Sequence, residues 1–133
     1  MTALTKDRNT PWREGDEFNH PAAANAVIHA GALVVLNASG DAAPGSTATG
    51  LTPAGRAEEA VDNTGGAAGD KTVQVRKGVF RYANDGSISR ANIGGTAYIV
   101  DDQTLAATDG GGTRSAAGEI VDVDADGVWV KIG

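Results

Sequence analysis

The sequence contains no cysteine, only two histidines, and only two each of Trp, Tyr and Phe among its 133 residues. Without cysteine, a disulfide framework and a thiolate metal site are both excluded. No apolar run approaches the roughly 20 residues that cross a bilayer as a helix, so we expect no membrane partner. The N-terminal stretch MTALTKDRNTPWREGDEFNH has no apolar signal segment. We therefore expect a soluble chain without a signal peptide.

Basic residues are also in the minority. The chain has 11 Lys and Arg against 17 Asp and Glu, which gives a formal net charge of −6. Nucleic-acid binding depends on a basic surface that neutralises phosphates, so this balance predicts no direct nucleic-acid partner.

Large apolar side chains are scarce as well. The apolar share is 41%, but 24 of these residues are alanine, and there are 19 glycines besides. Burying alanine stabilises a fold far less than the roughly 1.5–3 kcal/mol of a buried Val or Leu. The composition predicts a thin core that gains burial from self-association or from docking on a larger surface. The other interpretation is an ordinary small β domain with Ala-rich loops.

Residues 1–21 differ from the remainder of the chain. They are polar, contain two prolines and have no periodic apolar pattern, with Trp12 and Phe18 as the exceptions. Aromatic side chains are favoured anchors at interfaces, so we predict an extended N-terminal arm in which Trp12 and Phe18 bind a partner. The alternative is a loose terminus whose aromatic rings are exposed or fold back on the domain.

From residue 22 onward, short apolar runs alternate with turn signals. The clearest run is TVQVRKGVFRY over 72–82, where the two-residue period changes phase at Gly78 and predicts strands joined by a bulge or tight bend. Further strands are expected at 32–36 and 96–102. No segment has the ten or more helical residues that parallel crossovers use. Residues 22–133 are therefore predicted to form one all-β domain, a small antiparallel β-sandwich or barrel of jelly-roll-like or β-tulip-like form.

The stretch DVDADG at 122–127 resembles the start of an EF-hand calcium loop. Such a loop needs a bidentate Glu at its twelfth position, and here that position is Gly133. Val121 and Val123 alternate with Asp122 and Asp124, and Asp-Gly is a strong hairpin signal. The pattern therefore predicts a hairpin with Ala125-Asp126-Gly127 at its tip, and no metal site.

No catalytic or cofactor motif is complete. His20 and His29 have no second ligand at a metal-binding spacing. GLTPAGRA at 50–57 has the glycine spacing of a P-loop but lacks its Lys and hydroxyl residue. No nucleophile stands in the context of a triad. We expect no enzyme activity, no cofactor and no metal.

Charges are unevenly distributed along the chain. Basic residues gather in 71–90 and acidic residues in 101–133. These segments could pair between copies in a ring, or they could lie on neighbouring strands of one sheet and pair within the chain. The sequence leaves both interpretations open.

Four patterns together resemble the small capsid decoration, or cement, proteins of tailed bacteriophages. They are the Ala/Gly-rich segment HAGALVVLNASGDAAPG, the strand VQVRKGVFRY, the Gly-led strand GGTAYIVDD, and the closing hairpin AAGEIVDVDADGVWVKIG. The extended N-terminal arm is also similar to arms of that family. The resemblance covers about residues 22–133.

The resemblance implies a non-enzymatic protein on the outer surface of the virion capsid, where it binds the major capsid protein and stabilises the shell. It also implies a homo-oligomer, with a trimer favoured over a dimer. Two alternatives stay open. One is another phage structural domain, such as a tail-tube, fibre or head-completion piece. The other is a carbohydrate- or calcium-binding β module.

Overall fold

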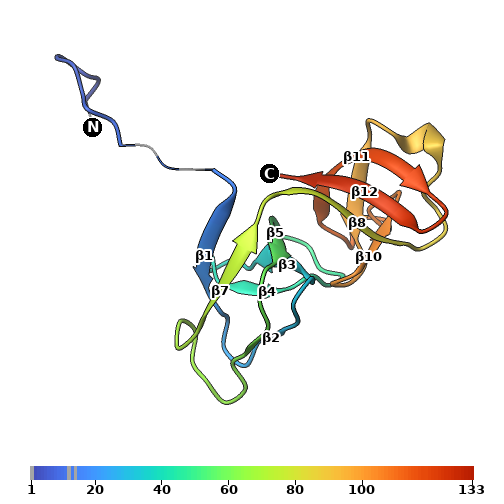
Figure 1. Ribbon diagram of the computed structural model, residues 1–133, viewed down its shortest axis with the longest axis horizontal. Coiled ribbons are helices and arrows are strands. Elements are labelled where there is room, and N and C mark those ends of the chain that lie inside the picture. Colours follow the sequence, from blue (N-terminus) through green and yellow to red (C-terminus); the bar gives the residue numbers. More distant parts are fainter. Residues whose placement is uncertain (1, 12, 14) are drawn as a thin grey trace.

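A computed structural model describes residues 2–11, 13 and 15–133 of the chain. Nearly all of the regular structure is β, arranged as a five-stranded sheet, a closed five-stranded barrel and a two-stranded ribbon (Figure 1). The described elements are β1 (Glu17–Pro21), β2 (Val27–Ile28), β3 (Leu33–Leu36), β4 (Ala42–Pro44), β5 (Thr52–Ala57), β6 (Val61–Asp62), β7 (Thr72–Arg76), β8 (Gly78–Asn84), η1 (Arg90–Asn92), β9 (Thr96–Ile99), β10 (Thr104–Ala106), β11 (Ala116–Asp124) and β12 (Gly127–Ile132).

The first sheet has the strand order β1-β7-β5-β3-β4, and all its neighbouring strands are antiparallel. Just beyond β1, Ala22 forms a parallel bridge to Ala42 in β4, so the two ends of the sheet approach each other. Strands β2 and β6 pair as a separate ribbon. The core of this half consists of small side chains, among them Ala22, Val34 and Val73.

The barrel has the order β10-β8-β12-β11-β9. Four of its five pairings are antiparallel, but β10 lies parallel to β8. The return to a parallel strand passes through η1 and β9 and not through an α-helix. The expectation of antiparallel pairing throughout is wrong for this strand pair, because η1 and β9 form the crossover without a long helix. The all-β barrel class predicted from the sequence is confirmed.

One stretch of chain connects the two halves. Strand β7 ends at Arg76 in the first sheet, and β8 begins at Gly78 in the barrel, with only Lys77 between them. The change of sheet is the bend that the phase shift predicts. Val73 and Val75 are buried in the first core, whereas Tyr82 is buried in the barrel core.

Strand β3 contributes to both cores. Leu33 and Val35 lie in the barrel core, while Val34 lies in the core of the first sheet. All three side chains are 0% exposed. A strand that is buried on both faces is expected to be continuously apolar, and this explains the run Leu33–Leu36. The two halves therefore share strand β3.

The C-terminal hairpin is confirmed. Strands β11 and β12 pair from Glu119↔Lys131 to Asp124↔Gly127, which leaves Ala125 and Asp126 as the loop. The register shifts between Ile120 and Asp122, so β11 contains a bulge that simple alternation does not predict.

The buried apolar side chains are small. Among the described residues, nine of the buried apolar residues are alanine, and Tyr82 is the one aromatic residue with them. Phe18, Phe80 and Trp129 lie at intermediate exposure instead. These three aromatic residues are therefore only partly buried. Among the described residues, no helix has the length and apolarity to cross a membrane.

Candidate interaction surface

The carboxylates of Asp122 and Asp124 in the DVDADG stretch accept hydrogen bonds from the chain itself. One carboxylate oxygen of Asp124 accepts hydrogen bonds from the N–H groups of Asp126 and Gly127 at 2.8 and 3.0 Å. The other accepts from Trp129 Nε1 at 2.9 Å. These donors, Trp129 first, lower the pKa of Asp124 below its ordinary value. Asp122 accepts from Arg90 Nη1 at 3.0 Å. The carboxylates thus serve the hairpin, and no group of three or more metal-ligating side chains occurs in the described part of the chain.

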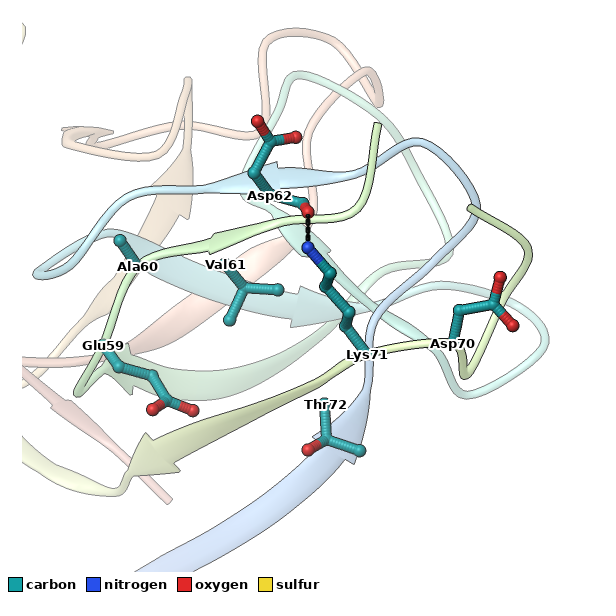
Figure 2. Close-up of a pocket in the computed structure, with 7 residues that line it drawn as sticks. All are labelled: Glu59, Ala60, Val61, Asp62, Asp70, Lys71 and Thr72. Carbon is teal, nitrogen blue, oxygen red and sulfur yellow. Dashed lines mark hydrogen bonds between the residues drawn. The ribbon is translucent and has the colours of Figure 1, made fainter. Parts of the chain in front are cut away.

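An open hollow between β6 and β7 shows the same separation of acids. Seven residues line it: Glu59, Ala60, Val61, Asp62, Asp70, Lys71 and Thr72. Figure 2 shows the three carboxylates pointing away from one another, with the ammonium of Lys71 bonded to the carbonyl oxygen of Asp62 at 2.6 Å. The carboxylate of Asp62 accepts instead from Thr64, which lowers its pKa. This hollow holds no paired acid and base.

The uneven charges pair within the chain. Arg81 on β8 lies 3.8 Å from Asp126 in the loop between β11 and β12, and Arg90 pairs with Asp122 on β11. In the first sheet, Arg76 pairs with Glu17 at 2.6 Å. For Arg81 and Arg90 the structure shows pairing within the chain, as the second interpretation expects. Pairing between copies stays a prediction.

The two predicted arm residues have different outcomes. Trp12 lies outside the described residues. Phe18 lies in β1, opposite Val75 of β7, so the last five residues of the predicted arm 1–21 form a strand of the sheet. The described residues from 2 to 16 contain no strand, and Figure 1 shows this segment extending away from the body.

Charged side chains surround the ring of Phe18. The guanidinium of Arg13 lies 4.6 Å from the ring centroid and the ammonium of Lys77 lies 5.1 Å from it. His20 stacks alongside at a centroid distance of 6.4 Å. Partial burial and then the charge of Lys77 lower the pKa of His20. Phe18 and His20 therefore pack against their own chain at the edge of the sheet, and a partner-binding role for Phe18 stays a prediction.

The backbone of β1 offers an unused edge. Lys77 N donates to Asp16 O at 2.7 Å, and Ala22 N donates to Lys71 O at 2.8 Å. Because bonded and non-bonded pairs alternate in an antiparallel ladder, Phe18 and His20 bond to β7 between these two points. The N–H and C=O groups of Glu17 and Asn19 point the other way. Strand β4 meets that side only at the end of β1, where Ala22 bridges to Ala42 and Ala23 N donates to Ala42 O at 2.8 Å. Along Glu17–Asn19, no other strand in the described part of the chain lies on that side.

We call this surface the β1 edge: the backbone of Glu17–Asn19 on its open side, with the partly buried side chains of Phe18 and His20. This edge lies within residues 1–21, all of which the sequence pattern predicts to be an arm. The available signal was the alternation of Phe18 and His20 with the polar residues Glu17 and Asn19, which is typical of a strand.

The outer face of the barrel carries a second aromatic group. Trp129 on β12 lies opposite Arg81 on β8, whose guanidinium is 5.6 Å from the indole ring. Val79 beside them is 47% exposed. Aromatic and arginine side chains are the types enriched in protein interfaces, and here they occur without a catalytic set near them.

Comparison with protein-family models, with curated proteins and with solved structures found no match.

Proposed function

We propose that the chain is a bacteriophage capsid decoration protein, a structural and non-enzymatic component that binds the outer surface of the head. Its partner would be the major capsid protein, whose contacts it stabilises. It would act as a homo-oligomer, either the trimer that the sequence resemblance favours or a dimer.

The observation that carries the proposal is the N-terminal segment. Its described residues before β1 are exposed and form no strand, and the segment runs directly into the edge strand of the first sheet. Leu4, in this segment, is 72% exposed. Arg13 and Asp16 contact the body next to β1. The exposed polar residues before them are suited to lie along another protein, where ordering them contributes contacts. Trp12 would be one of its anchors.

The small buried side chains support the same role. A fold whose core consists largely of Ala and Val gains stability from each contact with a larger surface. Many weak contacts on a repeating shell also add up to strong retention, since each bound arm holds the next contact at high effective concentration.

The test is binding to undecorated heads assembled from the major capsid protein of the phage that encodes the chain. A variant that lacks residues 1–16 keeps β1 and should fold, which circular dichroism and thermal melting can verify. We expect it to need at least about tenfold more protein to saturate the heads than the full-length chain, equivalent to about 1.4 kcal/mol per site.

The matched control is a full-length chain in which residues 2–16 are scrambled, which keeps composition and charge. It should bind as poorly as the truncated variant. A truncated protein that saturates heads as well as the intact chain would contradict the role of the arm. Reconstruction of decorated particles gives the second test, because density on the tail instead of the shell would contradict decoration altogether.

A further inference from the structure

A hollow of about 320 Å³ lies where strand β8 of the barrel passes the first sheet. Its lining consists of Gly31, Arg56, Val79, Phe80, Arg81, Tyr82 and Trp129. Three of the six aromatic residues of the chain are among them. The lining also contains two arginines and no acidic residue, in a chain whose formal net charge is −6. Aromatic and arginine side chains are the usual anchors of protein interfaces, so this hollow is a candidate binding site.

The backbone of β8 is open along this hollow. Strand β10 covers β8 only at Ala83 and Asn84. Ala83 N donates to Gln103 O at 2.8 Å, so the N–H of Ala83 faces the side of β10. Because the backbone groups of successive residues in a strand face opposite sides, those of Arg81 and Val79 face the same side as those of Ala83. In the part of the chain that the structure describes, no strand pairs with Arg81 and Val79 there.

The two guanidinium groups of the hollow lie on opposite faces of β8. Arg56 lies over the ring of Phe80, 4.6 Å from its centroid, and Arg81 lies over the ring of Trp129 at 5.6 Å. Phe80 and Arg81 are successive residues of one strand, so their side chains point to opposite faces. Since both line the hollow, it runs along the edge of β8, with one guanidinium on each side.

Each guanidinium keeps donors for a further acceptor. Nε and Nη2 of Arg56 both donate to one carboxylate oxygen of Glu58, at 3.0 and 2.7 Å. Among the described residues, Nη1 of Arg56 has no hydrogen-bond partner. Arg81 lies 3.8 Å from Asp126, which is longer than a hydrogen bond. The side chains of Arg56 and Arg81 are 39% and 44% exposed, so a partner can reach both.

We propose that the hollow binds an extended acidic segment of a partner protein, in which two consecutive residues are Asp or Glu. The segment pairs its backbone with Val79 and Arg81 as an added strand. Successive side chains of an added strand point to opposite faces, so one carboxylate reaches Arg81 and the other reaches Arg56. This binding depends neither on the N-terminal arm nor on a capsid. It can therefore fail while the proposed function holds, and the reverse.

An acidic peptide fits the hollow better than a free anion does. The open edge of β8 offers C=O acceptors as well as N–H donors, and a second strand supplies partners for both. A free anion would leave the C=O groups of Val79 and Arg81 unpaired. The rings of Phe80 and Trp129 add apolar contact for the stems of the acidic side chains.

The test is titration of the isotope-labelled full-length chain with short capped peptides, followed through its amide NMR signals. The probe is Thr-Val-Glu-Glu-Val-Thr, which directs one Glu to each face. We expect it to shift the amide signals of Val79 and Arg81. It should bind at least about tenfold more tightly than the neutral peptide Thr-Val-Gln-Gln-Val-Thr. The permuted peptide Thr-Glu-Val-Glu-Val-Thr places both Glu on one face and should bind about fivefold more weakly than the probe.

Variants of the chain separate the charge from the backbone. Arg81→Gln should weaken binding of the probe about fivefold. The matched control Arg90→Gln removes an exposed arginine outside the hollow and should leave binding unchanged. Val79→Pro removes an N–H that faces away from β12, and it should also weaken binding about fivefold. Val79→Ala keeps this N–H and should bind as the original chain does.

Several results would overturn the inference. They are a probe that shifts no signal of the hollow at millimolar concentration, equal binding of the neutral or the permuted peptide, and an unchanged affinity in Arg81→Gln. Glutarate that shifts the same signals as tightly as the probe would show a simple anion site and would overturn it equally. If Val79→Pro does not fold, the peptide series and Arg81→Gln still decide.

Discussion

Replacing Gly118 with alanine tests the packing of the barrel most directly. A Cβ at this position in β11 would lie 2.0 Å from the carbonyl oxygen of Lys131 and 3.2 Å from Val130 Cγ2. Even a weak carbon–oxygen contact needs about 3.3 Å, so β12 would have to move by about 1.3 Å. A ladder bond that is normally near 2.9 Å then lengthens beyond the useful range.

The expected cost follows from these distances. Overpacking costs about 1–3 kcal/mol, and the loss of a ladder bond adds about 1 kcal/mol. Against this, alanine restricts the unfolded chain and returns about 0.4–1 kcal/mol. We expect a net loss of about 2–3 kcal/mol in the free energy of unfolding, or a fall in Tm of roughly 10 °C for a chain of this size.

Urea unfolding followed by circular dichroism gives the measurement, with the m-value as a check on two-state behaviour. The matched control is Gly15→Ala, where a Cβ meets nothing within 4 Å. It should change stability by less than about 0.5 kcal/mol. A Gly118→Ala protein as stable as this control would refute the close approach of β11 and β12.

Two further predictions concern the turn and the shared strand. Trp129→Phe removes the first of the donors that lower the pKa of Asp124, so this pKa should rise toward 3.8 in a carboxyl NMR titration, and an unmoved pKa would contradict the bond. Because folding lowers the pKa of Asp124, its carboxylate stabilises the folded chain above pH 3.8. This stabilisation is lost as the pH falls through the lower pKa of the folded state. Val34→Ala and Val35→Ala should each lower the free energy of unfolding by about 2 kcal/mol. In methyl NMR spectra, the first should shift the signals of Val73 and the second those of Ile99, because these residues lie in different cores. The same set of shifted signals in both variants would contradict separate cores.

Sequence patterns were sufficient where one face of a strand is buried and the other is solvated. The alternation around Val128 and Val130 predicts the last strand because Trp129 and Lys131 face outward there. The phase change at Gly78 predicts the crossing between sheets, because the side that faces a core changes with the sheet. Local chemistry decides both cases.

The remainder depends on contacts between distant segments. Strand β10 is three residues long and pairs parallel with β8, so its own sequence carries little signal. The bulge between Ile120 and Asp122 is a shift of register against β12, and the alternation of Val121 and Val123 does not indicate it. Strand β1 is an edge strand whose Glu17 and Asn19 are polar and exposed, so its sequence does not differ from that of an exposed arm.

The candidate surface was predicted only in part. Phe18 was singled out from the sequence, but as a free anchor on an arm and not as the inner-face residue of a sheet edge. The open backbone of Glu17 and Asn19 could not be foreseen, since it follows from the hydrogen-bond phase of β1 against β7. That phase is a property of the pair of strands.

The double burial of β3 also has a consequence for synthesis on the ribosome. Every residue of the first core lies before residue 76, so this half can pack while the C-terminal strands are still inside the exit tunnel. Leu33 and Val35 would then face water, because the partners that cover them belong to segments translated later. During that interval the nascent chain exposes an apolar strip on β3. A chaperone or a neighbouring chain would bind it at this stage.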